Sequence, residues 1–186
     1  MVVTASCVPT GERPELVDEF LDDLPAAGTA ACPSPSDPFS RFGAAEITVE
    51  AADGSSFLRC VLVADTDELR ARGLMEVYGL GGYAGMLFSF PDDSTGSFWM
   101  GNTFIPLTIA FIDNGGQVVS TADMEPCPDA VDCTFYEPTG PYRWALEVEQ
   151  GGLAEFGLVE GARLDPDTLP LARTAGMVDG TEIALR

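Results

Sequence analysis

Residues 98 to 119, FWMGNTFIPLTIAFIDNGGQVV, place an indole, an amide and a hydroxyl directly before an apolar run. Trp99 offers a face for stacking, while Asn102 and Thr103 offer hydrogen-bonding groups. In one interpretation these polar groups satisfy backbone left unpaired beside Pro106, which has no N–H to donate. In the other, they line a shallow binding cleft. We prefer the structural corner, because short motifs often record a fold rather than a site.

The residue types that are missing limit the available chemistry. The chain contains no histidine, and all 9 of its basic residues are arginine. It therefore lacks the histidine of a Ser-His-Asp or Cys-His system and the lysine of a Schiff base or phosphate loop. Carboxylate, tyrosine and thiol chemistry remains. Calcium is conceivable at acidic loops such as PDDSTGS and LDPDT, but neither has EF-hand spacing, and we predict neither a metal nor a cofactor.

The charge of the chain argues against two classes of partner. Aspartate and glutamate number 30, and the net charge is -21. Binding to nucleic acid depends on clustered cations that release counterions from the phosphates, so we expect no nucleic-acid partner. An anionic membrane is disfavoured for the same reason, except through a lipid anchor. The acidic residues are scattered along the chain, which favours solubility as their role.

Five cysteines suggest an exported protein. Cys127 and Cys133 lie in the short loop EPCPDAVDCTFY and are expected to form a disulfide, with Cys32 and Cys60 as the second pair. A zinc site is the alternative, but the chain has no C-x-x-C pair and no histidine. The remaining cysteine, Cys7, follows Thr-Ala-Ser, which is similar to the end of a bacterial lipoprotein signal. An ordinary terminus with a free thiol explains it equally well.

The chain divides into an arm and a strand-rich domain. Residues 14 to 24 predict a short helix, and the following Pro-, Ala- and Ser-rich stretch predicts a linker. We therefore expect a weakly attached arm over residues 1–43. Residues 66 to 77 predict one helix in the domain, with Asp65 as N-cap and Glu68 completing a capping box.

Alternating apolar and polar residues predict antiparallel strands elsewhere. Residues 45–51 and 57–64 indicate one hairpin, and the Asn-Gly-Gly turn after Asp113 indicates a second. In RWALEVE, alternate side chains fall on opposite faces, which predicts a half-buried strand. The apolar content suffices for two sheets packed face to face.

The motifs RARGLM, GMLFSF, FWMGNTFIPLTIAFID, PC and YRWALEVEQGG, in this order, resemble the bacterial and archaeal family called domain of unknown function 192. The matching positions are Arg72, Gly73, Leu74, Met75, Trp99, Met100, Asn102, Thr103, Pro106, Asp113 and Glu147. The chain departs from the family pattern at Gly101, Thr108 and Ala162. The resemblance implies a mainly β fold, an antiparallel sandwich of jelly-roll type with one or two short helices, and no established activity. It assigns residues 44–165 to this domain and leaves 166–186 as a C-terminal extension with room for an added strand.

Six residues are candidates for ligand binding: Arg72, Trp99, Asn102, Thr103, Asp113 and Glu147. Arg72 lies one helical turn from Glu68 and Glu76, so a local ion pair explains it. A bidentate pair with Glu147 across the fold is the alternative.

Two functions from different classes follow. We prefer a non-catalytic extracytoplasmic module, lipid-anchored or secreted, that binds a small ligand, a glycan or a protein. A carboxylate-based hydrolase acting on a glycan is the alternative, and it needs two facing carboxylates.

Overall fold

The computed structural model describes residues 32–173, which form a mainly β fold. The elements in order are β1 (Gly43–Glu50), β2 (Ser56–Ala64), α1 (Asp67–Arg72), β3 (Gly85–Ser94), β4 (Phe98–Trp99), β5 (Leu107–Ile112), β6 (Val118–Met124), β7 (Phe135–Tyr136), β8 (Tyr142–Glu149), α2 (Leu153–Phe156), β9 (Arg163–Leu164) and the 3-10 turn η1 (Pro166–Thr168). The predicted helix at 14–24 and Cys7 lie outside the described residues. So does the C-terminal extension from residue 174 onward.

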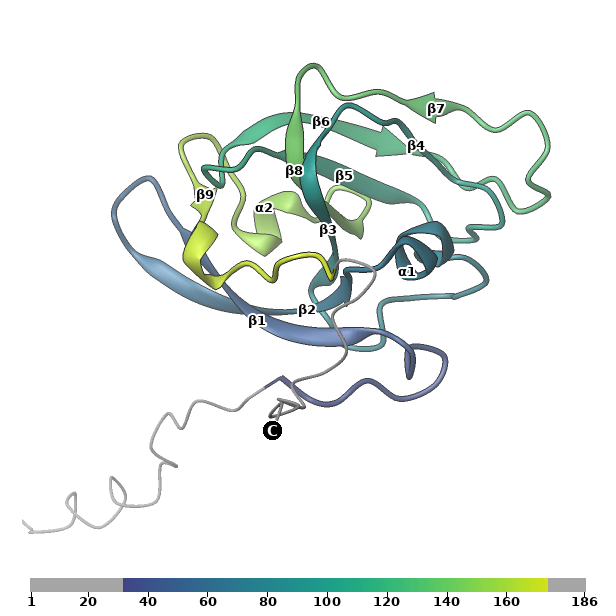
Figure 1. The fold of residues 1–186 in the computed structure, drawn as a ribbon, viewed down its shortest axis with the longest axis horizontal. Helices are drawn as coiled ribbons and strands as arrows, with labels where there is room; N and C mark the ends of the chain where they lie inside the picture. Colours follow the sequence, from purple (N-terminus) through teal and green to yellow (C-terminus); the bar gives the residue numbers. More distant parts are fainter. Residues whose placement is uncertain (1–31, 174–186) are drawn as a thin grey trace, which may run out of the picture. The chain divides into compact units, whose positions relative to one another are not determined.

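Seven strands form one curled sheet in the order β6-β5-β8-β3-β2-β1-β9, and β4 pairs with β7 in a separate two-stranded ladder (Figure 1). The predicted jelly-roll sandwich is therefore not confirmed. The expectation of a fully antiparallel domain is wrong at one position, because β2 and β3 run parallel. The long connection through α1 permits this, since parallel neighbours need a crossover rather than a tight turn.

Both predicted hairpins are present. β1 pairs with β2 from Gly43 opposite Val63 to Glu50 opposite Ser56. β5 pairs with β6 across the turn that follows Asp113. Local turn chemistry therefore sets these two registers.

β8 is buried on both faces, although its alternation predicted burial of only one. Trp144, Leu146 and Val148 belong to an apolar cluster that also contains Phe156 of α2. Ala145 lies in the opposite cluster. Figure 1 shows α2 within the curve of the sheet, consistent with the first cluster. Glu147 lies on the same face as Ala145 and is buried as well, because other segments of the chain pack over that face.

Helix α1 is shorter than predicted and begins differently. Thr66, not Asp65, is the N-cap, and its Oγ1 accepts a hydrogen bond from Leu69 N at 3.3 Å. The helix ends at Gly73, where φ is 45°, a value that side chains rarely adopt. Asp65 instead pairs with Arg173, at 2.8 and 2.9 Å. No helix in the described part of the chain is long and apolar enough to cross a membrane.

The segment from 32 to 43, expected to belong to the weakly attached arm, is packed against the β domain. Phe39 and Phe42 are buried in the core. Cys32 forms a disulfide with Cys60 of β2, and the Pro33 carbonyl accepts a hydrogen bond from the hydroxyl of a buried tyrosine at 2.6 Å. Composition alone marked this stretch as linker because its few aromatic side chains are scattered among Pro and Ser.

Candidate functional site

A cavity of about 250 Å³ opens between α1, β3, β4 and β8. Its wall combines aromatic rings with a few polar groups. The lining residues used below are Arg70, Arg72, Phe88, Phe90, Phe98, Trp99, Thr103, Tyr142 and Glu147. Four of the six predicted ligand-binding residues, namely Arg72, Trp99, Thr103 and Glu147, are brought together here.

Glu147 lies in the central strand β8. Its partners are Met86 in β3 and Ile109 in β5, so its neighbours across both strand pairs are apolar. The residue is only 5% exposed. No other described residue forms a hydrogen bond with its carboxyl group, and the carboxyl oxygens keep a small accessible surface where the residue lines the cavity. Burial raises the pKa of Glu147 from 4.5 to about 8, because the charged form loses its hydration.

Aromatic rings form one wall. The Phe98 ring lies edge-on to Phe88 with centroids 5.0 Å apart, and Phe90 packs in the same way on Tyr142 at 5.2 Å. The Tyr142 hydroxyl donates to the Gly96 carbonyl at 2.8 Å. This hydroxyl is satisfied by the protein, and burial raises its pKa, so it remains neutral at physiological pH.

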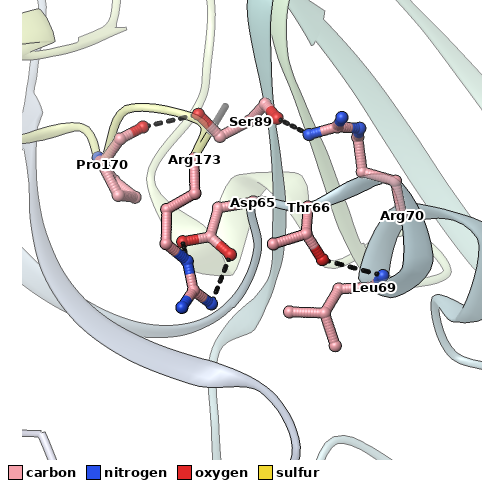
Figure 2. A network of polar contacts seen from close by, with 7 residues as sticks. All are labelled: Asp65, Thr66, Leu69, Arg70, Ser89, Pro170 and Arg173. Atoms are coloured by element: carbon pink, nitrogen blue, oxygen red, sulfur yellow. Dashed lines mark hydrogen bonds and ion pairs between the residues drawn. The ribbon is translucent and has the colours of Figure 1, made fainter. Parts of the chain in front are cut away.

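Arg70 and Arg72 of α1 also line the cavity, but both guanidinium groups are engaged. Arg70 donates to the Ser89 carbonyl at 2.6 Å, pairs with Asp67, and lies 5.1 Å from the centre of the Phe90 ring. Figure 2 shows Arg70 approaching the Ser89 carbonyl while the Ser89 hydroxyl points away to Pro170. Arg70 is therefore fixed between the helix and the sheet.

The ion pair of Arg72 is local. Its NH1 lies 2.8 Å from the Glu76 carboxylate, and both side chains are largely exposed. The alternative pairing with Glu147 is absent from the structure. The reason is geometric, since Glu76 lies four residues further along the chain, just past the end of α1, and offers a hydrated partner, whereas Glu147 is enclosed in the sheet.

Trp99 is 43% exposed at the edge of the cavity. Its ring stacks on Phe135 of β7, with an interplanar angle of 16° and centroids 6.3 Å apart. A Cβ at Gly101 would lie 2.4 Å from the indole, so any larger residue here would have to displace the Trp99 ring from this position. The missing side chain at Gly101, a departure from the family pattern, thus makes room for the ring.

Asn102 occupies a structural corner. Its φ is 57°, a left-handed conformation that asparagine tolerates better than most residues. The Asn102 N–H donates to the Cys127 carbonyl at 2.9 Å, and its own carbonyl accepts from Glu76 N at 2.8 Å. Thr103, in contrast, is buried and its side chain lines the cavity. The structural interpretation therefore accounts for Asn102, while a binding role for Thr103 stays a prediction.

Asp113 lies away from the cavity, in the β5–β6 turn. Its Oδ1 accepts hydrogen bonds from Gly115 N and Gln117 N, both at 2.9 Å. These bonds hold the turn and account for an aspartate at this position.

Cys127 and Cys133 form the second disulfide, as predicted. Backbone hydrogen bonds join Cys127 to Asn102 and Thr103, at 2.9 and 3.2 Å. The disulfide loop thereby supports the edge of the cavity from the β7 side.

Arg70, Phe90 and Tyr142 are site residues that sequence reasoning missed. Arg70 is the first residue of the Arg-x-x-Gly-Leu-Met motif, and its place in that motif could have identified it as a candidate. Neither aromatic residue carried a signal, since each falls in a strand pattern typical of ordinary core packing.

Comparisons with known proteins agree with this architecture. The family model DUF192, described as Uncharacterized ACR, matches residues 47–166. A crystal structure of a protein of unknown function from Novosphingobium aromaticivorans is similar with a TM-score of 0.59 and 31% identity, covering 76% of this chain and 98% of its own. A proposed transcription regulator from Sinorhizobium meliloti is similar with a TM-score of 0.58 and 25% identity, covering 69% and 97%. No curated protein matches the chain.

Proposed function

The chain belongs to the DUF192 family, and on that premise we propose that it is a non-catalytic module that binds a small ligand in the cavity between α1 and β8. The observation that carries this proposal is Glu147. Its carboxyl group is buried in the middle of the sheet, faces the cavity, and has no hydrogen-bond partner in the part of the chain that the structure describes.

A purely structural role does not account for Glu147. Burial of a carboxyl group without a partner costs several kcal/mol, whereas an apolar side chain of similar volume would cost nothing. Its cross-strand neighbours Met86 and Ile109 show that this layer of the sheet accepts apolar residues. A ligand that completes the hydrogen bonds of the carboxyl group would offset the cost.

The size and lining of the cavity suit a small molecule. An apolar protein cavity of about 150 Å³ is sufficient to bind benzene. The volume here is about 250 Å³, and the wall combines five aromatic residues with aliphatic, polar and charged groups. This combination is typical of small-ligand sites.

The glycan hydrolase alternative has less support. Hydrolysis by two carboxylates requires an acid and a base or nucleophile roughly 5 to 10 Å apart across the substrate. Among the described residues that line this cavity, Glu147 is the only carboxylate. The described lining of this cavity therefore lacks the second carboxylate that a glycan hydrolase needs.

A role in transcription, suggested by the description of the Sinorhizobium meliloti protein, is opposed by charge. The net charge of -21 repels a phosphate backbone. Two disulfides support an oxidising, extracytoplasmic location instead. Anchoring through a lipid at Cys7 is part of this proposal.

Ligand-observed NMR against a library of small fragments tests the binding function. Ser97 is exposed and lines the cavity, so Ser97→Trp should obstruct the entrance without disturbing the core. Thr95→Trp is the matched control, since Thr95 is exposed, two residues away, and outside the lining. We expect fragments that bind wild type and the control but not Ser97→Trp. Binding that all three proteins share would place the ligand elsewhere and overturn the proposal.

A further inference from the structure

The proposed function leaves the class of ligand open, and the inference here rests on that function. We propose that the cavity takes an uncharged, ring-sized molecule whose carbonyl or amide oxygen accepts a hydrogen bond from the Glu147 carboxyl group. The nearest strand neighbours of Glu147 are apolar, and the adjoining wall is aromatic. A polar group on the ligand is thus required at one place, and an apolar body fills the rest.

Glu147 acts as a hydrogen-bond donor because no described residue donates to its carboxyl group, and the two arginines of the lining are paired with Asp67 and Glu76 instead. An ionised carboxylate needs several donors or a nearby cation when it is removed from water. Thr103, the other buried polar residue of the lining, directs its hydroxyl toward the Gly101 carbonyl at 3.5 Å. The raised pKa of Glu147 agrees with a protonated carboxyl group at neutral pH. In that form it can donate one hydrogen bond and accept others.

The charged groups that face the cavity disfavour a cationic ligand. Arg70 and Arg72 both line it, and each positive charge would repel a bound ammonium group. Arg70 is held by Ser89 and Asp67, and its side chain is 12% exposed, so it cannot swing away freely. Tyr142, the remaining titratable group of the described lining, is neutral.

An anionic ligand is disfavoured for two other reasons. Arg70 and Arg72 would attract an anion, but each is already paired with a carboxylate, Asp67 and Glu76, and a ligand carboxylate beside Glu147 would lose its hydration. The net charge of -21 also opposes the approach of any anion. A neutral ligand avoids both penalties.

Three probe molecules with the same ring separate these classes: benzamide is neutral, benzylamine is a cation near neutral pH, and benzoate is an anion. Affinities are measured at pH 6.5 by protein-observed NMR, with Ser97→Trp to assign binding to the cavity. We expect benzamide to bind at least about tenfold more tightly than either charged probe, the difference expected for one buried hydrogen bond and an avoided charge burial.

Two substitutions test the role of Glu147. Glu147→Leu removes the donor and should weaken benzamide binding by about tenfold. In wild type the affinity should also fall above pH 8, approaching tenfold for each further pH unit, because the ionised carboxylate must regain its proton before it can donate. Glu147→Gln keeps an amide donor that does not titrate, so this pH dependence should disappear.

The outcomes separate this inference from the proposed function. Tighter binding of benzylamine or benzoate in the cavity would refute the uncharged class while leaving the binding function intact. Equal benzamide affinity of wild type and Glu147→Leu would refute the role of the carboxyl group. Failure of all three probes to bind at millimolar concentration would refute the ring-sized class, whereas the function itself is judged by the fragment experiment with Ser97→Trp.

Discussion

Glu147 lies directly opposite Met86 across the antiparallel pair of β8 and β3. A carboxyl group and a thioether thus share one layer of a buried sheet, and both residues are almost completely enclosed. The chain has 30 acidic residues, and Glu147 lies where burial makes ionisation of its carboxyl group costly.

The protonation of Glu147 predicts how the stability of the domain changes with pH. The unfolded chain releases this proton near pH 4.5, whereas the folded protein holds it until about pH 8. Between these values the folded state binds more protons, so the free energy of unfolding falls as pH rises. Glu147→Gln should remove this loss and stabilise the protein at pH 8 by on the order of 4 kcal/mol.

Urea unfolding of wild type and Glu147→Gln from pH 4 to 9 measures the effect. Glu149→Gln provides the control, because Glu149 lies on the same strand but is exposed. Its stability curve should follow that of wild type. Parallel curves for wild type and Glu147→Gln would show that Glu147 ionises in the folded protein as in water.

The two tryptophans should differ sharply when replaced. Trp99 is 43% exposed and its ring contacts Phe135, so Trp99→Ala should cost about 1 kcal/mol of stability while weakening ligand binding. Trp144 is 4% exposed and its Nε1 donates to the Pro170 carbonyl at 3.0 Å. Trp144→Ala should therefore cost about 3 kcal/mol or more.

Thermal and urea unfolding of the two variants give these values. A loss of about 3 kcal/mol or more for Trp99→Ala would mean that its indole belongs to the core. That result would favour the structural corner over a binding cleft for this stretch.

The disulfide between Cys127 and Cys133 should stabilise the edge of the cavity. Replacing both with serine should cost about 2 kcal/mol, since the closed loop is short. It should also loosen the hydrogen bonds to Asn102 and Thr103 and raise the acrylamide quenching of Trp99, measured in a Trp144→Phe background.

The pair Cys32 and Cys60 is the matched control. It closes a longer loop, with a sequence separation of 28, so its removal should cost more, about 3 to 4 kcal/mol. Quenching of Trp99 in the folded protein should nevertheless stay at the wild-type level. Equal changes in both double variants would mean that the Cys127 loop has no special link to the cavity.

Ser89 should contribute to holding the segment after η1 against the sheet. It is fully buried, and its hydroxyl donates to the Pro170 carbonyl at 2.6 Å (Figure 2). Ser89→Ala should cost about 1 kcal/mol, because Trp144 still donates to that carbonyl. Ser40→Ala removes an exposed hydrogen bond and should change stability by less than about 0.5 kcal/mol, measured by urea unfolding. A Ser89→Ala protein as stable as Ser40→Ala would contradict the assigned role.

The features determined by the sequence alone are those encoded within a few residues. The hairpins β1–β2 and β5–β6 follow from alternation and from turn residues that accept unusual backbone angles. The end of α1 at Gly73, by contrast, was missed, because apolar periodicity continues beyond the glycine. The cysteine pairing could be predicted from the short loop between Cys127 and Cys133 and from the four cysteines that remain once Cys7 is set aside. The family could be predicted from the order of its motifs.

Tertiary structure decided what surrounds those elements. The alternation in β8 places Glu147 on the face opposite Trp144, but only the packing of segments 39–42, 74–83 and 98–100 over that face makes the carboxyl group buried. The choice of Arg70 over Arg72 as the enclosed arginine depends in the same way on the proximity of Ser89. Burial and cavity shape depend on contacts between residues far apart in sequence, and periodicity within one strand or helix carries no information about which neighbour will cover it.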